Sequence, residues 1–309
     1  MIAAIVATVA ILFNHNNKDS ERHLAPYQPQ SLAGTLGTIK LDRRPVAVAA
    51  LGPGDPDAVL SLGVQPVAIG GIQSPLPSWL QTMVHSSATL LPNADPAALA
   101  AAKPDLIIDT GQIDKSTYDT LSAIAPTLTR PANSGQDLVW QQQLPWIATA
   151  LGRSDTAKTL LDDAAAQQAT IKSQHPRFGG KTIVVINYSD TTTTVVTPTS
   201  APTNYLEGLG FRYHPYAKRT SPADPPDKPL DVNQSFYQVV TADVMIVLRT
   251  DKAAGGGGYA GLPGPFNGYS GTLVIVDDPA TITALNTGGP AATSYLNHAL
   301  VNKLSLLVK

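Results

Sequence analysis

The chain has 309 residues, of which 43% are hydrophobic and 14% are charged, and its formal net charge at pH 7 is −2. This composition is globular, and the length suffices for two domains of ordinary size that each bury a core. A charge so close to zero gives no long-range attraction to nucleic acid. Because the chain contains no cysteine, disulfides, thiolate metal sites, cysteine catalysis and a lipidated N-terminal cysteine are excluded.

Residues 1–13 are almost wholly apolar, and residues 14–20 then turn abruptly polar. The apolar run is shorter than the roughly 20 residues of an ordinary membrane helix. It also lacks a basic n-region and a clear cleavage site. We interpret it as the core of a signal peptide or signal anchor, followed by a polar tether over residues 14–43. A buried N-terminal helix is the alternative, but nothing caps it. The interpretation places the rest of the chain outside the cytoplasmic membrane.

The first half of the chain alternates short apolar runs with helical patterns, and glycine or proline punctuates most of them. The expected strands are residues 45–51, 66–69, 105–109 and 125–128, and the expected helices are residues 56–61, 94–101 and 117–125. Alternating strands and helices predict a parallel sheet, with ligands at the carboxyl ends of its strands. We assign residues 44–135 to this N-terminal lobe.

A long helix is expected in the middle of the chain, over residues 154–175. Ser154 is a suitable N-cap, and Pro176 with the glycines at 179–180 ends the helix. At 1.5 Å per residue, such a helix is roughly 30 Å long, about the width of a small domain. Residues 136–151 form a shorter helical pattern that Pro145 should kink or restart. We interpret residues 136–176 as a hinge and inter-lobe helix.

The second half, residues 177–309, repeats the alternation and forms the C-terminal lobe. Its expected strands are residues 182–187, 191–194, 244–248 and 273–276, and its expected helices are residues 203–209, 236–240 and 291–307. Residues 214–229 are rich in proline and charge, which indicates a surface loop, and residues 254–258 form a flexible glycine tract.

No motif in the chain favours an enzyme, a metal site or a resident cofactor. The turn Gly52-Pro53-Gly54 follows a strand, but Asp57 occupies the third small position of a dinucleotide-binding motif. The six histidines have no metal-ligand spacing, and no Gly-x-Ser-x-Gly elbow exists. An enzyme is therefore the least supported of the functional hypotheses.

Polar and aromatic residues at strand ends and beside the hinge are the candidate ligand-binding residues. They are Trp79, Gln112, Tyr118, Trp140, Asn187, Tyr188 and Arg249. Arg249 directly follows an apolar strand, where its guanidinium could meet an anionic ligand; a surface ion pair is the alternative. The tryptophans could stack on a flat ligand, although large aromatic residues more often belong to a core.

Five segments occur in an order that is typical of one protein class. They are VAVAALGPGDPDAVLSLGVQPVAIG (46–70), KPDLII (103–108), LSAIAPT (121–127), LGRSDTA (151–157) and ADVMIV (242–247). In this order they resemble the periplasmic binding proteins of the iron–siderophore, haem and cobalamin uptake class. Residues 118–128 are especially similar to actinobacterial iron-siderophore binding proteins. The resemblance runs from about residue 44 to the C-terminus.

The resemblance implies a class III solute-binding fold, in which two Rossmann-like α/β lobes with parallel sheets are joined by one backbone helix. It also implies small closure motions and a monomer that captures a ferric siderophore or haem for an ABC importer. Members that dock on a permease usually carry one glutamate on each lobe, whereas the matching positions here hold Ala97 and Ser235. This departure leaves open an envelope scaffold or interaction protein that keeps the fold without standard permease docking.

Overall fold

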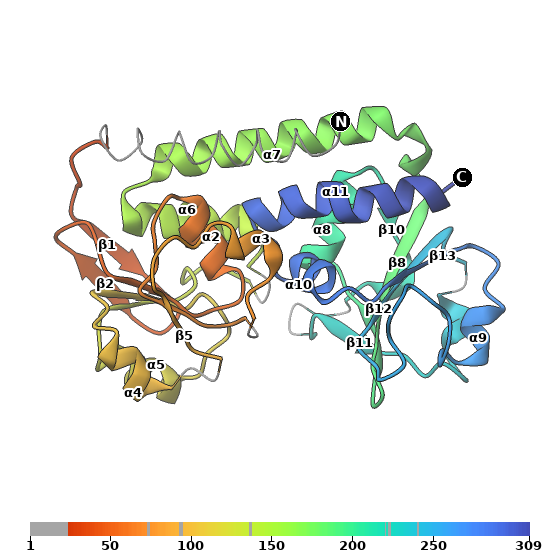
Figure 1. The fold of residues 1–309 in the computed structure, drawn as a ribbon, viewed down its shortest axis with the longest axis horizontal. Helices are drawn as coiled ribbons and strands as arrows, with labels where there is room; N and C mark the ends of the chain where they lie inside the picture. The colour runs from red at the N-terminus through yellow and green to blue at the C-terminus, as the bar shows by residue number, and fades with distance from the viewer. Residues whose placement is uncertain are drawn as a thin grey trace.

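A computed structural model of the chain describes residues 24–72, 75–92, 95–135, 138–219, 221, 224–239 and 241–309. The predicted signal segment, residues 1–13, lies outside this part. Among the described helices, none has the length and apolar character needed to span a bilayer. Figure 1 shows two α/β lobes side by side, with helix α7 running above both.

The N-terminal lobe contains a five-stranded parallel sheet, as expected from the alternation. Its strands are β3 (Val48–Ala50), β4 (Ala68–Ile69), β5 (Thr89–Leu90), β6 (Leu106–Ile108) and β7 (Thr127–Leu128), in the spatial order β5-β4-β3-β6-β7. Its helices are α2 (Asp55–Ser61), α3 (Ser78–Gln81), α4 (Pro96–Ala101) and α5 (Lys115–Ser122). Every residue of the central strands β3 and β6 is buried, which explains their continuous apolar runs.

The expected tether over residues 14–43 is wrong for its last third. Strands β1 (Gln30–Ala33) and β2 (Thr38–Leu41) form an antiparallel hairpin. Leu32, Ile39 and Leu41 alternate with more exposed neighbours, and all three are buried in the core of the N-terminal lobe. The hairpin is therefore part of the lobe, because its apolar side chains complete that core.

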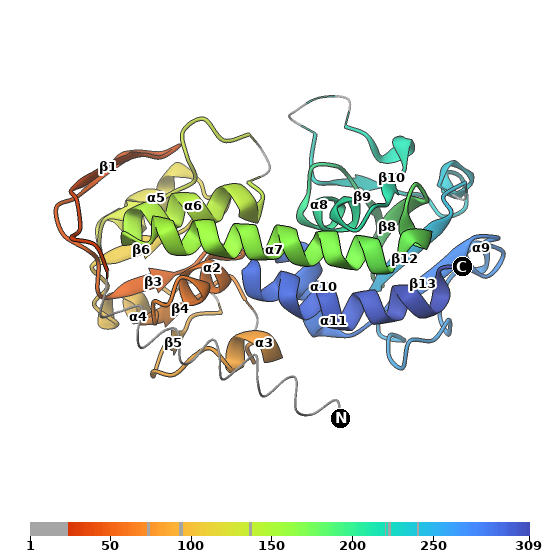
Figure 2. The ribbon, with the colours of Figure 1, turned by 90° about the horizontal axis from the view of Figure 1, so that it is seen from above.

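Helices α6 (Trp140–Leu151) and α7 (Ser154–Gln174) connect the lobes. Pro145 lies inside α6, which continues through it rather than restarting. Helix α7 begins at Ser154, so that Arg153 and not Ser154 occupies the N-cap position. Seen from above, α7 runs across both lobes (Figure 2). It buries few side chains, chiefly Ala157 and Ala164, and thus lies on the outside of both lobes.

The C-terminal lobe contains a mixed sheet with the spatial order β11-β9-β8-β12-β13. Its strands are β8 (Thr182–Tyr188), β9 (Thr193–Val196), β10 (Arg212–Tyr213), β11 (Asp227–Pro229), β12 (Val244–Arg249) and β13 (Thr272–Val276). Strands β10 and β12 both pair with β8 in parallel, and β13 pairs with β12 in parallel. By contrast, β9 is antiparallel to β8 and β11 is antiparallel to β9, so this edge of the sheet is not parallel.

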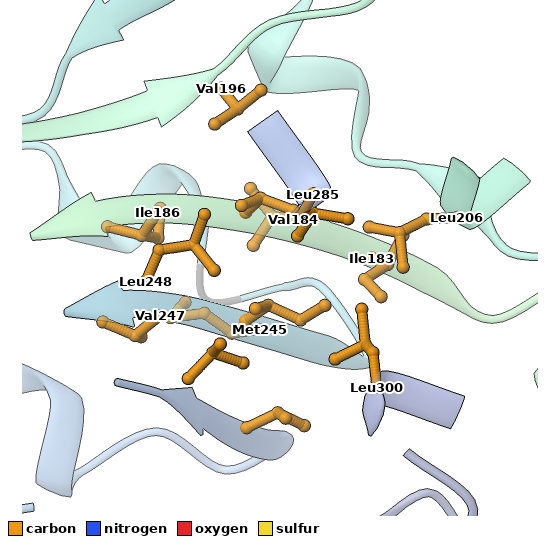
Figure 3. Close-up of a cluster of buried hydrophobic side chains, with 14 of the residues drawn as sticks. Ile183, Val184, Ile186, Val196, Leu206, Met245, Val247, Leu248, Leu285 and Leu300 are labelled. Carbon is orange, nitrogen blue, oxygen red and sulfur yellow. The ribbon is translucent and has the colours of Figure 1, made fainter. Parts of the chain in front are cut away.

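Helical segments cover this second sheet. They are η2 (Pro176–Phe178), α8 (Ala201–Gly208), η3 (Pro215–Ala217), η4 (Phe236–Gln238), α9 (Gly264–Asn267), α10 (Pro279–Thr287) and α11 (Pro290–Leu307). Figure 3 shows side chains of β8 and β12 packed with Leu206, Leu285 and Leu300 from the covering helices. Helix α10 was not expected from the sequence, although Asp278 caps it and Pro279 occupies its first turn.

One hydrophobic core crosses the boundary between the lobes. Leu60, Trp79 and Leu80 come from α2 and α3 of the N-terminal lobe, yet they belong to the same buried cluster as the C-terminal sheet. The Trp79 ring stacks on Tyr295 of α11, with 5.2 Å between the ring centroids. Because tightly packed cores resist deformation, this shared cluster limits how far the lobes can move apart.

Candidate functional site

The carboxyl ends of β3 and β6 form a dense polar cluster in the N-terminal lobe. Asp55, which is fully buried, accepts hydrogen bonds from the backbone N–H groups of Gly52 and Thr110, both at 2.9 Å. Its other oxygen accepts from the Thr110 hydroxyl at 2.5 Å and from Gln143 Nε2 of α6 at 2.8 Å. A Cβ at Gly52 would lie 2.8 Å from the N atom of Gly111, so this turn requires glycine. The cluster ties both strand ends to α6.

Asp109 lies beside this cluster and is almost completely buried. One of its oxygens accepts a hydrogen bond from the N–H of Gly111 at 3.1 Å. Burial, reinforced by the nearby charge of Asp55, raises the pKa of the Asp109 carboxyl to about 7. The carboxylate is therefore a source of pH-dependent stability in this part of the site.

Replacing Asp109 by asparagine should make the protein more stable above neutral pH. Since the folded pKa of Asp109 is raised, its contribution to stability is present below the unfolded pKa and is lost as pH rises through about 7. We expect Asp109→Asn to gain roughly 2 kcal/mol at about pH 8.5 relative to pH 5. Urea unfolding at both pH values measures this difference. A variant with the same pH slope as the parent protein would contradict the expectation.

Asp57 joins the two lobes through its carboxylate. The backbone N–H groups of Ala291 and Ala292, at the start of α11, donate to it at 3.0 and 2.7 Å. The Ser61 hydroxyl donates at 3.1 Å from the next turn of α2. A carboxylate here satisfies free N–H groups and the positive end of the helix dipole. Burial nevertheless raises the pKa of Asp57 to about 6.

A pocket of about 210 Å³ lies at the β9–β11 edge of the C-terminal sheet. Its lining residues are Thr197, Lys218, Arg219, Asp224, Pro225, Asp227, Lys228 and Pro229. Figure 1 shows β11 on the side of the C-terminal lobe that faces the N-terminal lobe. Ligand pockets usually measure about 300–1,000 Å³, so this one suits an arm of a ligand and not a whole chelate.

The pocket carries three cationic side chains, and two of them are held by neighbouring groups. Arg219 Nε donates to the Thr197 hydroxyl at 2.9 Å. The Lys228 ammonium lies 4.3 Å from the centroid of the Tyr216 ring, as in a cation–π contact. Asp227 accepts a hydrogen bond from Asn187 Nδ2 at 3.1 Å, which brings this predicted site residue to the pocket wall.

Arg249 was expected to meet an anionic ligand, but its side chain is turned into the protein. The residue is 1% exposed, and its Nε and one terminal nitrogen donate to Asp251 at 2.9 and 2.7 Å. The terminal nitrogens of Arg249 also donate to the carbonyl oxygens of Gly258 and Ala260, both at 2.7 Å. The ion pair of the alternative is therefore present, but it is buried with Asp251 and does not lie on the surface, and the guanidinium is not presented to a ligand. Arg249 holds the loop from the end of the glycine tract to Ala260.

The other predicted site residues are dispersed. Trp79 and Trp140 are 8% and 7% exposed and belong to hydrophobic cores, which is the alternative that the sequence left open. Gln112 is exposed after β6, and the half-buried Tyr118 packs its hydroxyl against Gly37 of the hairpin. Tyr188 donates to the Gly261 carbonyl at 3.3 Å. Asn187, through its bond to Asp227, contacts a residue that lines the pocket.

The three cationic residues of the pocket were not among the ligand-binding residues predicted from the sequence. Residues 214–229 were interpreted as a charged surface loop, but residues 227–229 form the edge strand β11. The available signal was the concentration of positive charge at Lys218, Arg219 and Lys228 within a proline-rich segment. Prolines restrict a loop and can hold such charges close together.

Solved structures with the same architecture cover most of the chain. PiaA of Streptococcus pneumoniae TIGR4 in complex with ferrichrome has a TM-score of 0.76 at 22% identity, covering 89% of this chain and 97% of that one. SirA of Staphylococcus aureus complexed with staphyloferrin B has a TM-score of 0.69 at 21% identity, covering 89% and 98%. These similarities establish the two-lobed fold of class III solute-binding proteins.

A curated relative matches part of the sequence. It is the probable siderophore-binding lipoprotein YfiY of Bacillus subtilis (strain 168), which is 25% identical over 206 residues. The matched region is 64% of this chain and 62% of the relative, so the match spans less than two thirds of that protein. The family model described as periplasmic binding protein matches residues 48–228, more than half of the chain, and the chain therefore belongs to the periplasmic binding protein family.

Proposed function

We propose that this chain is an extracytoplasmic solute-binding protein that captures a ferric siderophore for ABC-type iron uptake. The observation that carries the proposal is the cationic pocket at β11, on the side of one lobe that faces the other. A two-lobed receptor binds its ligand between the lobes by shape and charge, without covalent chemistry. The likeness to proteins named for siderophore binding supports this choice.

The lining of the pocket suits the oxygen-rich rim of a ferric siderophore. The residues that line the pocket are threonine, lysine, arginine, aspartate and proline. These side chains offer charge and hydrogen bonds to the oxygen-rich rim of a chelate. In the proposal the iron arrives already chelated, and the protein needs no resident cofactor.

The predicted signal or anchor segment supports a position in the cell envelope, either tethered to the membrane or secreted. In this setting the protein works as a monomer that passes its ligand to a permease. The shared core of α2, α3 and the C-terminal lobe favours small movements between the lobes. Ligand transfer then depends on modest closure and not on wide opening.

Binding of a ferric siderophore should raise the melting temperature of the protein. A ligand at 100 times its Kd adds about 2.7 kcal/mol to the free energy of unfolding. We expect the melting temperature to rise clearly with at least one ferric complex and to rise less with the iron-free form of the same siderophore. Differential scanning fluorimetry measures these shifts, and isothermal titration gives the affinities. A panel of hydroxamate, catecholate and hydroxycarboxylate complexes that all leave the melting temperature unchanged would refute the proposal.

A second candidate function, an envelope scaffold without standard permease docking, is favoured by Ala97 and Ser235. Ala97 is exposed in the first turn of α4, and Ser235 is half-buried before η4, so neither position presents a carboxylate. Chemical cross-linking in the native membrane distinguishes the two functions. Cross-links to a permease support uptake, whereas ligand-independent cross-links to other envelope proteins alone support the scaffold.

A further inference from the structure

The pocket at β11 has more positive than negative charge. Lys218, Arg219 and Lys228 line it together with Asp224 and Asp227. Burial raises the pKa of Asp227, while the bond from Asn187 and the charge of Arg219 oppose that rise. Three cations against two carboxylates leave an excess of one positive charge in the lining of the pocket. The pocket therefore attracts negative charge.

The cations are placed by the fold. Strand β11 pairs with β9, and this register sets Lys228 opposite Val195. The Thr197 hydroxyl accepts a hydrogen bond from Arg219 Nε and donates one to the carbonyl oxygen of Pro226, both at 2.9 Å. A side chain fixed by such contacts loses less conformational entropy when a ligand binds. The geometry is thus prepared for an acidic group before any ligand arrives.

Ferric chelates differ in charge by chemical class. Three hydroxamate groups carry as much negative charge as Fe(III) carries positive charge, and their complex is neutral. Catecholate and hydroxycarboxylate groups carry more negative charge, and their complexes are anionic. Lysine and arginine bind carboxylate and phenolate oxygens through charge-assisted hydrogen bonds, which are stronger than neutral ones.

We propose that the pocket formed by Lys218, Arg219 and Lys228 makes this protein selective for anionic ferric chelates over neutral ferric trihydroxamates. The inference rests on the proposed function and specifies its substrate class. An acidic arm of the chelate enters the pocket, while its metal centre remains between the lobes. The small volume of the pocket fits this division, because it admits an arm and excludes the whole complex.

The test compares three probes, ferric dicitrate, ferric enterobactin and ferrichrome, by isothermal titration with the full chain. We expect at least one anionic complex to bind about tenfold or more tightly than ferrichrome, a difference of about 1.4 kcal/mol. Raising NaCl from about 50 to about 500 mM should weaken the anionic complex more than ferrichrome, because salt screens charge.

Variants that remove positive charge from the pocket test whether the pocket causes the selectivity for anionic complexes. The double variant Lys218→Gln/Lys228→Gln should weaken the anionic complex about tenfold and change ferrichrome affinity less than about twofold. Lys252→Gln, an exposed cation outside the pocket, is the matched control and should change neither affinity. Arg219→Gln is a further variant, and melting temperatures verify that each protein is folded.

The possible failures are distinguishable. Tighter binding of ferrichrome, or an equal loss of all ligands in the double variant, would overturn the charge selectivity while leaving siderophore capture intact. If the parent protein bound none of the three complexes and no other ferric siderophore, the proposed function itself would be overturned.

Discussion

Replacing Arg249 by methionine should lower the free energy of unfolding by about 3–5 kcal/mol. The side chains of Arg249 and Asp251 are 0% and 4% exposed, so the variant leaves a carboxylate without its buried partner. It also removes the donors to the carbonyl oxygens of Gly258 and Ala260. Buried polar groups that lose their partners retain the full cost of desolvation. Urea denaturation monitored by circular dichroism measures the loss.

Two controls separate the ion pair from a general effect of removing charge. Arg177→Met removes an exposed arginine and should change stability by less than about 0.5 kcal/mol. The double variant Arg249→Met/Asp251→Leu should be more stable than Arg249→Met, because it no longer buries an unpaired carboxylate. If Arg249→Met were as stable as the parent protein, the supporting role of Arg249 for its loop would be wrong.

Replacing Asp57 by asparagine should remove a pH-dependent contribution to stability from the contact between the lobes. The folded pKa of Asp57 is raised to about 6, so its stabilising contribution is present below the unfolded pKa and is lost as pH rises through about 6. The shift corresponds to about 3 kcal/mol. The stability difference between parent and Asp57→Asn should therefore shrink by about 2 kcal/mol from about pH 4.5 to about pH 7.5.

Asp57→Ala tests the hydrogen bonds themselves. The variant leaves the N–H groups of Ala291 and Ala292 without an acceptor, and we expect it to lose about 2 kcal/mol at pH 5. Asp114→Ala is the matched control, because Asp114 caps α5 within one lobe and is exposed. Its loss should be smaller than that of Asp57→Ala, with no change in the pH slope near 6. Equal losses in both variants at every pH would show that the contact between the lobes has no special role.

The elements that the sequence predicted best are those whose burial is continuous or periodic. Strand β12 is buried at every position, and its run VMIVL was identified as a strand. The bounds of helix α7 were predicted to within one residue at each end, from the spacing of its apolar residues and from the residues that flank it. In both cases the signal is local, because the pattern of apolar residues along several consecutive positions indicates which face of the element is buried.

Strands β5, β10 and β11 escaped prediction because they carry too few residues to show a period and lack the apolar runs that marked β4 and β7. Strands β5 and β10 each span two residues, and β11 spans three with the composition DKP. Their hydrogen-bond partners come from other segments, and tertiary contacts overcome weak local preference. The hairpin of β1 and β2 shows alternation over four residues per strand, which a polar and proline-bearing context concealed.

The sequence by itself determined the two α/β halves, the long connecting helix and the order of segments that marks the family. The tertiary structure decided the partners of the polar groups. Asp57 and the N-terminus of α11 are 234 residues apart, and no local pattern relates them. Likewise, Arg249 follows its strand as expected, but only the folded loop buries its guanidinium against Asp251. Periodicity reports which faces are buried, whereas the pairing of charges depends on how distant loops meet in space.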